Sequence, residues 1–113
     1  SWDGNSFKYP QGDAELTVQK IIITASDKEV SLSNHCHPVP LAGYILKGSV
    51  KVVKPSGEHV FFNSGDALIE VVDTWHKGIF TENTELIVFY AGKSGMPLTV
   101  FKEDNSALSE ACE

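Results

Sequence analysis

Two stretches decide the fold of this chain: residues 35–48, which read HCHPVPLAGYILKG, and residues 65–76, which read GDALIEVVDTWH. His35 and His37 are two positions apart, so their side chains leave the same face of an extended strand. His76 follows after several turn-forming segments, and only a sheet that folds back on itself brings it near that pair. Three imidazoles that converge inside a β structure are typical of a site for a transition metal. The pattern therefore predicts that His35, His37 and His76 bind one ion.

The size and charge of the chain limit its class and its partners. With 113 residues, of which 42% are hydrophobic, it forms one domain with one hydrophobic core. The formal net charge of −6 argues against nucleic acid and anionic membrane surfaces as partners, because neither attracts an acidic protein. No apolar run approaches the length of a membrane span. We expect no nucleic-acid or membrane partner, and a small molecule as the ligand.

The two cysteines, Cys36 and Cys112, do not form the closely spaced framework of a small disulfide-rich protein. A disulfide between them is one alternative, but the sequence favours reduced thiols and a cytoplasmic location. Cys36 lies between two proposed metal ligands, so its side chain points away from them in a strand. We expect it to be a small buried core residue.

The remaining pattern is that of an all-β protein. Turn-forming residues recur roughly every 8 to 12 positions, as they do in sandwiches and barrels. Gly48 is free to adopt a positive φ in a tight turn. Residues 1–14 form an arm that carries Trp2, Phe7 and Tyr9, and either covers an open edge or contacts a second subunit. The strands are predicted at residues 15–25, 29–37, 41–46, 50–53, 59–62, 67–72, 85–91 and 98–101.

The two opening stretches resemble the motifs of the cupin family. The first cupin motif pairs His-x-His with a later glycine, which match His35, His37 and Gly48. The second begins with a glycine and contains a histidine, which match Gly65 and His76. The resemblance covers residues 29–90 and implies a double-stranded β-helix, a jelly-roll-like antiparallel barrel with the metal inside. It divides the chain into an arm (1–14), a cupin β-barrel domain (15–102) and an acidic tail (103–113).

Four motif positions differ from the cupin pattern. Leu41 replaces the glutamate that is a metal ligand in many cupins, Val71 replaces a proline, and Phe80 replaces an asparagine. Asp73 replaces a glycine, and aspartate tolerates the positive φ that such a turn needs. The remaining imidazoles suit Zn, Ni, Fe or Cu. Mn is less suitable, because it prefers carboxylate ligands.

Other candidate site residues lie around His76. Glu70 is a candidate catalytic acid or base, or a replacement carboxylate ligand, although an outward-facing strand residue is the simpler interpretation. Trp75 and Phe80 flank His76 and, with Tyr44, are candidates for lining a pocket, whereas most aromatic residues of this chain fill the core. His59 fits neither motif and is expected on the surface.

Two classes of function follow from the resemblance. One is a metal-dependent enzyme, a dioxygenase or an isomerase that acts on a small organic molecule. The alternative is a non-catalytic module that binds or senses a small ligand or metal. Small cupins usually pair, so the resemblance also implies a homodimer, with the aromatic arm as a plausible contact.

Overall fold

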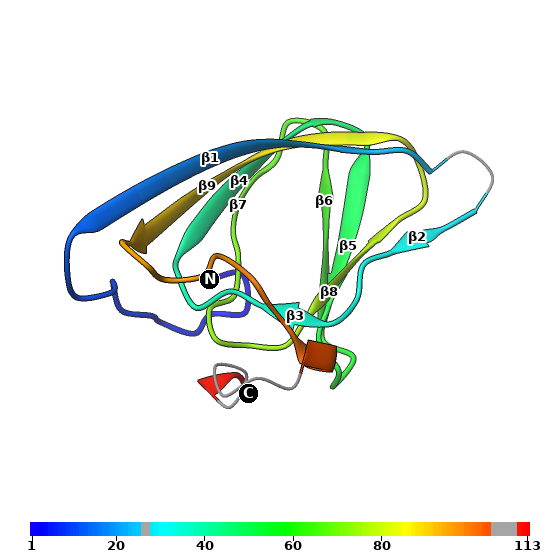
Figure 1. Cartoon of the computed structure of the whole chain (residues 1–113). Coiled ribbons are helices and arrows are strands. Elements are labelled where there is room, and N and C mark those ends of the chain that lie inside the picture. The colour runs from blue at the N-terminus through cyan, green and yellow to red at the C-terminus, as the bar shows by residue number, and fades with distance from the viewer. Residues whose placement is uncertain (26–27, 105–110) are drawn as a thin grey trace.

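The computed structural model describes residues 1–25, 28–104 and 111–113, and nearly all of its regular structure is β-strand. Two four-stranded antiparallel sheets face each other, with a two-stranded sheet beside them (Figure 1). The first has the order β1-β9-β4-β7, with the bounds Ala14–Ile23, Thr84–Lys93, Leu41–Lys47 and Ala67–Ile69. The second has the order β2-β8-β5-β6, with the bounds Val30–Ser31, Lys77–Phe80, Ser49–Val53 and His59–Asn63. The third pairs β3 (His35–Cys36) with β10 (Val100–Phe101), and a 3-10 helix follows at Lys102–Asp104.

The prediction of an all-β, jelly-roll-like antiparallel fold is confirmed. The expected closed barrel is not formed, because within the described residues the hydrogen-bonded ladders of the two large sheets do not join. Consecutive strands instead cross between the sheets at turns, as from β4 to β5 and from β6 to β7. The result is an open sandwich whose inner faces enclose the site.

The predicted strand at residues 29–37 is two short strands, because the chain changes partners along it. Its first part, β2, pairs with β8, and the backbone N–H of Leu32 donates to Gly78. Its second part, β3, pairs with β10, and the carbonyl of Asn34 accepts from Lys102. The segment thus passes from one sheet to another just before the histidines.

Gly48 forms the corner between β4 and β5, and its φ of +84° is the positive value predicted for it. A Cβ at this position would lie 2.5 Å from the hydroxyl oxygen of Thr84, so no other residue fits without movement. Thr84 is fully buried, and its hydroxyl donates to the carbonyls of Ser49 and Glu82. The corner is therefore fixed by close packing as well as by its backbone conformation.

Two apolar clusters pack between the sheets and surround a cavity. The buried members of the first are Ala25, Ile45, Val50, Val52, Phe62 and Phe80. Those of the second are Val39, Leu41, Val88 and Tyr90. Burial of these side chains is the main favourable contribution to the stability of the fold.

The expectation of reduced thiols is wrong, because Cys36 and Cys112 form a disulfide. The bond closes a loop of 76 residues in sequence, which in the chain-entropy model stabilises the fold by about 4 kcal/mol. Cys36 itself is fully buried, beside Trp75 and Val100. The cytoplasmic location stays a prediction, and it loses the free thiols on which it was based. No helix among the described residues has the length and apolar character needed to cross a membrane.

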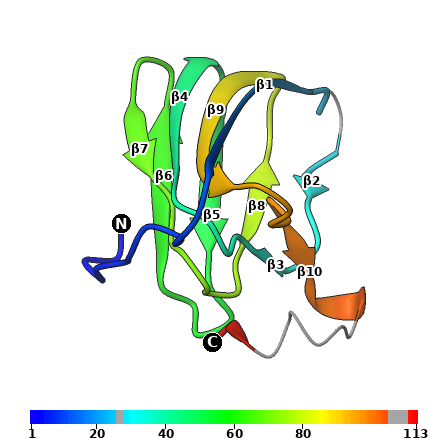
Figure 2. The same cartoon turned by 60° about the vertical axis from the view of Figure 1, so that its left-hand side comes forward.

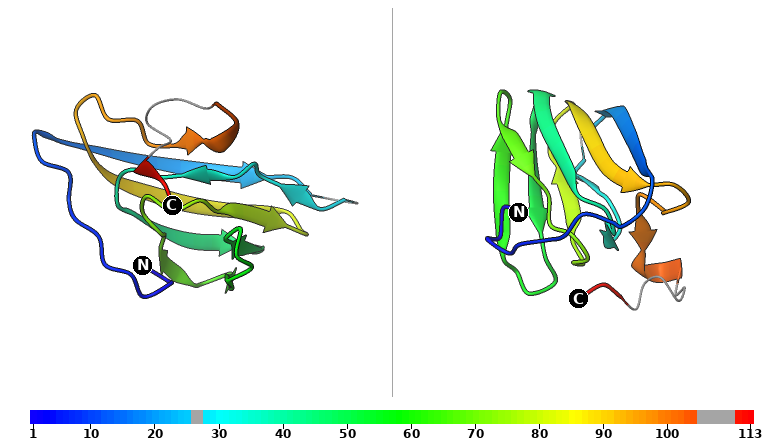
Figure 3. Two further views of the ribbon diagram at one scale, coloured as in Figure 1. Left: turned by 90° about the horizontal axis from the view of Figure 1, so that it is seen from below. Right: turned by 90° about the vertical axis from the view of Figure 1, so that its left-hand side faces the viewer.

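Both ends of the chain contact the same part of the sandwich (Figures 2 and 3). At the C-terminal end, Glu113 exchanges backbone hydrogen bonds with Asp73 and Trp75. Of the predicted tail, residues 105–110 lie outside the described residues. At the N-terminal end, Trp2 packs against the first cluster and its backbone N–H donates to Ile69. The arm thus covers the sandwich through Trp2, and the predicted domain limits stay a prediction.

Candidate metal centre

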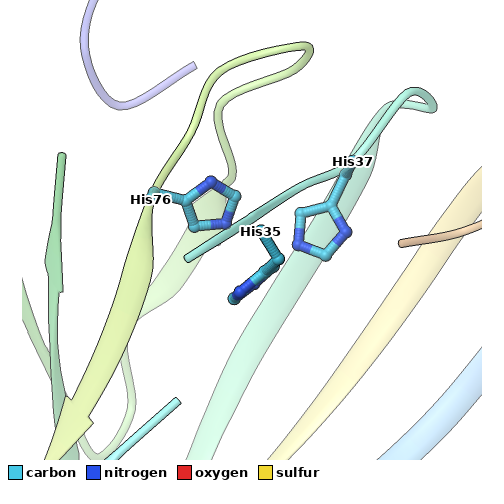
Figure 4. A group of neighbouring side chains, drawn as sticks. All are labelled: His35, His37 and His76. Atoms are coloured by element: carbon cyan, nitrogen blue, oxygen red, sulfur yellow. The ribbon is translucent and has the colours of Figure 1, made fainter. Parts of the chain in front are cut away.

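The backbone brings two of the three histidines side by side. His35 and His76 form an isolated antiparallel bridge, in which each backbone N–H donates to the other's carbonyl at 2.9 Å. Residues paired in this way project their side chains on the same face of the sheet. His37 lies two positions beyond His35 and shares that face. The three rings turn toward one space, with centroids 4.5 to 5.0 Å apart (Figure 4).

Each imidazole is held through its Nδ1 atom by a backbone carbonyl. The distances are 2.7 Å from His35 to Ser33, 3.0 Å from His37 to Leu98, and 2.8 Å from His76 to Thr74. A carbonyl only accepts, so Nδ1 must carry the proton and Nε2 must carry a lone pair. In metal sites, a hydrogen bond of this kind from the non-ligating ring nitrogen orients the histidine ligand.

Burial keeps all three rings neutral at pH 7. Desolvation lowers the pKa of His35 and of His76, and it lowers the pKa of His37 to about 3. For His35 and His37, the neighbouring His76 lowers the pKa further, because like charges repel. Neutral imidazole is the form that binds a metal ion, so no proton has to leave before binding.

The donor set fits a transition metal. One nitrogen from each histidine lies within 4.8 Å of the other two, and all three residues are buried. Nε2 of His76 is buried and has no hydrogen-bond partner among the described residues, and such atoms are rare unless a ligand satisfies them. Three neutral nitrogen donors with open positions for further ligands suit Zn, Ni, Fe or Cu.

The histidines form part of the wall of a cavity of about 500 Å³ between the sheets. Ser31, Ser33, His35 and His37, which occupy alternate positions along the chain, all lie in this wall. A volume of this size is within the range of small-molecule sites. The three candidate metal ligands therefore face the same cavity that could hold a small molecule.

Solved structures that match this architecture include cupins. DMSP lyase DddQ from Ruegeria pomeroyi matches with a TM-score of 0.62 and 15% identity, over 80% of this chain and 45% of that one. An RmlC-like cupin from Shewanella frigidimarina matches with a TM-score of 0.58 and 21% identity, over 72% of this chain and 69% of that one. The chain has a cupin fold.

The likeness lies in the structure rather than in the sequence. Oxalate decarboxylase from Bacillus subtilis also matches, with a TM-score of 0.59 and 18% identity, over 79% of this chain and 24% of that one. No protein-family model and no curated protein matches the sequence. The cupin domain spans 45% of DddQ and 24% of the decarboxylase, so these proteins support the fold and not a shared reaction.

Glu70 lies inside the cupin domain, not on its outer surface. Its side chain lines the cavity, and its Oε2 atom is 3.6 Å from Nε2 of His76. Its Oε1 atom accepts hydrogen bonds from the indole of Trp2 at 2.6 Å and from the backbone of Val71 at 3.0 Å. Desolvation raises the pKa of Glu70, although these two hydrogen bonds oppose the shift. One oxygen is thus anchored and the other faces the histidines.

Glu70 lies next to the position of the missing motif glutamate. Its backbone N–H donates to the carbonyl of Leu41, which occupies that position and also lines the cavity. A carboxylate from the end of β7 therefore enters the site beside the place where a cupin glutamate from β4 is expected.

The other predicted residues divide between the cavity and its surroundings. Phe80 lines the cavity, but Trp75 and Tyr44 do not, so both predictions are corrected. Trp75 precedes His76 and therefore faces the opposite way, against Cys36. Tyr44 lies between residues that face inward, and its own side chain is 45% exposed on the outer face of β4. His59 is exposed on β6.

Sequence reasoning missed the partner of Glu70. Trp2 was assigned to the arm as one of three aromatic residues, without a specific contact. Its ring also lies under the ammonium of Lys54, which pairs with Asp3 at 2.8 Å. From the sequence, one could have expected the indole N–H of Trp2 to need an acceptor if the ring is buried. The sequence does not indicate which residue provides that acceptor.

The depressed pKa of His37 predicts that the metal-free protein is sensitive to acid. The unfolded state takes up a proton near pH 6.5, whereas the folded state resists it to about pH 3. Stability from this residue is therefore present above pH 6.5 and is lost as the pH falls. At pH 5 the loss is about 2 kcal/mol. Urea unfolding of wild type and His37→Gln in EDTA measures it.

Glu70 changes the stability with pH in the opposite direction to His37. Comparing wild type with His37→Gln cancels this contribution of Glu70. A raised carboxyl pKa stabilises the folded state at lower pH and is present in both proteins. The stability difference between wild type and variant should therefore shrink between pH 7 and pH 5. Parallel pH profiles would contradict the assignment of His37 as a buried neutral histidine.

Proposed function

We propose that this cupin domain binds a divalent transition metal through His35, His37 and His76 and acts on a small molecule in the adjoining cavity. The observation that supports this most strongly is the common orientation of the three imidazoles. Each Nδ1 is hydrogen-bonded to a carbonyl. One ring nitrogen from each histidine lies within 4.8 Å of the other two. We assign Zn, Ni, Fe or Cu as the metal class and regard Mn as less suitable.

Glu70 is the residue that favours an enzyme. A bound metal would act as a Lewis acid toward an oxygen of the substrate. The carboxylate of Glu70 is held by Trp2 and presents its second oxygen toward the same space. A buried carboxyl group with a raised pKa is suited to take and return a proton. This favours an isomerase-type proton transfer over a dioxygenase, because oxygen chemistry does not by itself require a base at this position.

A non-catalytic metal or ligand-binding module is the second candidate. The observation that favours it is the 3.6 Å separation between Glu70 and His76, which places the carboxylate close enough to complete the ligand set. A ligand carboxylate is not free to transfer protons. The two functions therefore differ in whether Glu70 is needed for metal binding or for turnover.

Removal of one imidazole should abolish tight metal binding. We expect His76→Ala to lower zinc affinity by at least about 100-fold, since even the loss of a group that only orients a metal ligand costs about 10- to 100-fold. The matched control is His59→Ala, which removes an exposed histidine on β6 outside the cavity. Zinc content by mass spectrometry and affinity by calorimetry measure the effect. A His76→Ala protein that retained wild-type zinc affinity would refute the metal site.

Substitution of Glu70 should separate the enzyme from the binding module. We expect Glu70→Gln to retain zinc and to slow proton exchange at C3 of 2-oxohexanoate by at least about 100-fold, the usual contribution of a general base. Exchange in D₂O, followed by NMR on the zinc-loaded protein, gives the rate. If Glu70→Gln instead lost zinc, and wild type exchanged no faster than free zinc, the binding module would be supported.

The expected homodimer also remains our proposal, and the outer face of the first large sheet supports it. Exposed apolar side chains from all four strands gather there: Leu16, Val18, Ile22, Tyr44, Ile69, Ile87 and Phe89. Patches of this kind mark protein contacts. Lys20 and Glu85 neutralise each other on the same sheet, so two acidic copies can meet there without opposing like charges.

Sedimentation velocity tests this surface directly. We expect wild type to sediment as two chains and Val18→Glu to sediment as one, because a charge in the centre of an apolar interface is costly to bury. Phe61→Glu is the control, since Phe61 is similarly exposed but lies on β6 in the other sheet. A wild-type monomer would exclude the dimer.

A further inference from the structure

The cavity beside the histidines has an apolar interior. Its buried aliphatic and aromatic wall includes Val50, Val52, Phe80 and Val88, which belong to the two core clusters. The exposed part of the wall is formed by Gln19 of β1, Ser31, Leu32 and Ser33 around β2, and Phe101 of β10. The cavity therefore opens between the edge strands β1 and β2 and narrows onto apolar side chains.

The cavity wall lacks cationic side chains. None of the described residues that line it is a lysine or an arginine. Lys77 follows His76 directly, but Gly78 lines the cavity, so alternation along β8 turns Lys77 to the outer face. Lys54 is engaged by Asp3 and Glu58. Within the part of the chain that the structure describes, the proposed metal would be the only positive charge available to an anionic ligand in the cavity.

These two properties restrict the ligand. One anionic or chelating group can be satisfied by the metal, whereas a second carboxylate inside the cavity would be desolvated without a cation. An apolar body, in contrast, gains from leaving water. Gln19, Ser31 and Ser33 near the opening offer hydrogen bonds but carry no positive charge.

We propose that the cavity selects small molecules with a single metal-binding group and an apolar body, such as a monocarboxylate, and disfavours dicarboxylates of the same length. This inference rests on the proposed metal site and adds the substrate class to it. It concerns binding, so it holds for an enzyme and for a binding module alike.

Pentanoate and pentanedioate are the matched probes, since they differ only in the terminal methyl or carboxylate. Zinc content is measured first, and the affinity of each probe for the zinc-loaded protein is then measured by calorimetry. We expect pentanoate to bind at least about tenfold more tightly, because its methyl end is buried and the second carboxylate has no partner. Equal affinities, or tighter binding of pentanedioate, in a zinc-loaded protein would overturn the inference and leave the metal site intact.

Two neighbouring isoleucines provide the variants. Ile21 of β1 faces the cavity, whereas Ile22 is 65% exposed on the outer face of the same strand. We expect Ile21→Gln to reduce the preference for pentanoate severalfold and Ile22→Gln to leave it unchanged. An unchanged preference in a folded Ile21→Gln protein would contradict the assigned cavity. If Ile21→Gln does not fold, the ratio of the pentanoate and pentanedioate affinities of the wild-type protein still tests the inference.

The outcome without zinc is also informative. A wild-type protein that took up none of zinc, nickel, iron and copper would overturn the proposed metal site, and the inference with it, because the ligand's head group would have no anchor. Zinc uptake with equal probe affinities would overturn the inference alone. The two failures are therefore distinguishable.

Discussion

The pair of backbone hydrogen bonds between His35 and His76 is the constraint on which the site depends. It joins two segments that are 41 positions apart in sequence and fixes their register, since a shift of one residue would turn one ring outward. His37 then follows by strand alternation. Asp73 supports the same arrangement: its φ of 52° is the positive value expected for it, and its N–H donates to the carbonyl of His37.

Sequence patterns predicted those parts of the fold that follow from local periodicity. The long strands β1, β4 and β9, the corner at Gly48 and the shared face of the two early histidines are examples. Short strands were harder, because their pairing is decided by distant partners. β8 was missed entirely: it has only four residues, and its Gly78 reads as a break in a strand.

The wrong or ambiguous predictions for residues around the site also arise because strand pairing is decided by distant partners. Tyr44 and Trp75 are near the histidines in sequence, but the side on which a strand residue projects depends on register, which sequence does not fix. Glu70 was ambiguous for that reason, and its contact with Trp2 spans 68 positions. Contacts made by the arm and by the cysteines depend on how the chain ends return to the sandwich, and no local pattern encodes that.

Different parts of this cupin fold hold the proposed metal ligands and form the cavity wall. Backbone groups of the turns and short strands hold the imidazoles, and the long strands supply the apolar wall. Leu41 of β4 occupies the position where the cupin resemblance implies a glutamate, and its side chain forms part of that wall. Glu70 approaches from the end of the neighbouring strand β7. The imidazoles and the carboxylate are thus positioned by separate contacts.

The disulfide makes the support of the candidate metal centre depend on the redox conditions around the protein. Cys36 lies between two of the histidines, and Cys112 fastens residue 113 against the backbone on either side of Thr74, whose carbonyl orients His76. Reduction would break the disulfide cross-link between the C-terminal residues and the strand that carries His35. A preparation made under strongly reducing conditions would thus contain a centre whose outer support is no longer tethered, even though every ligand residue is present.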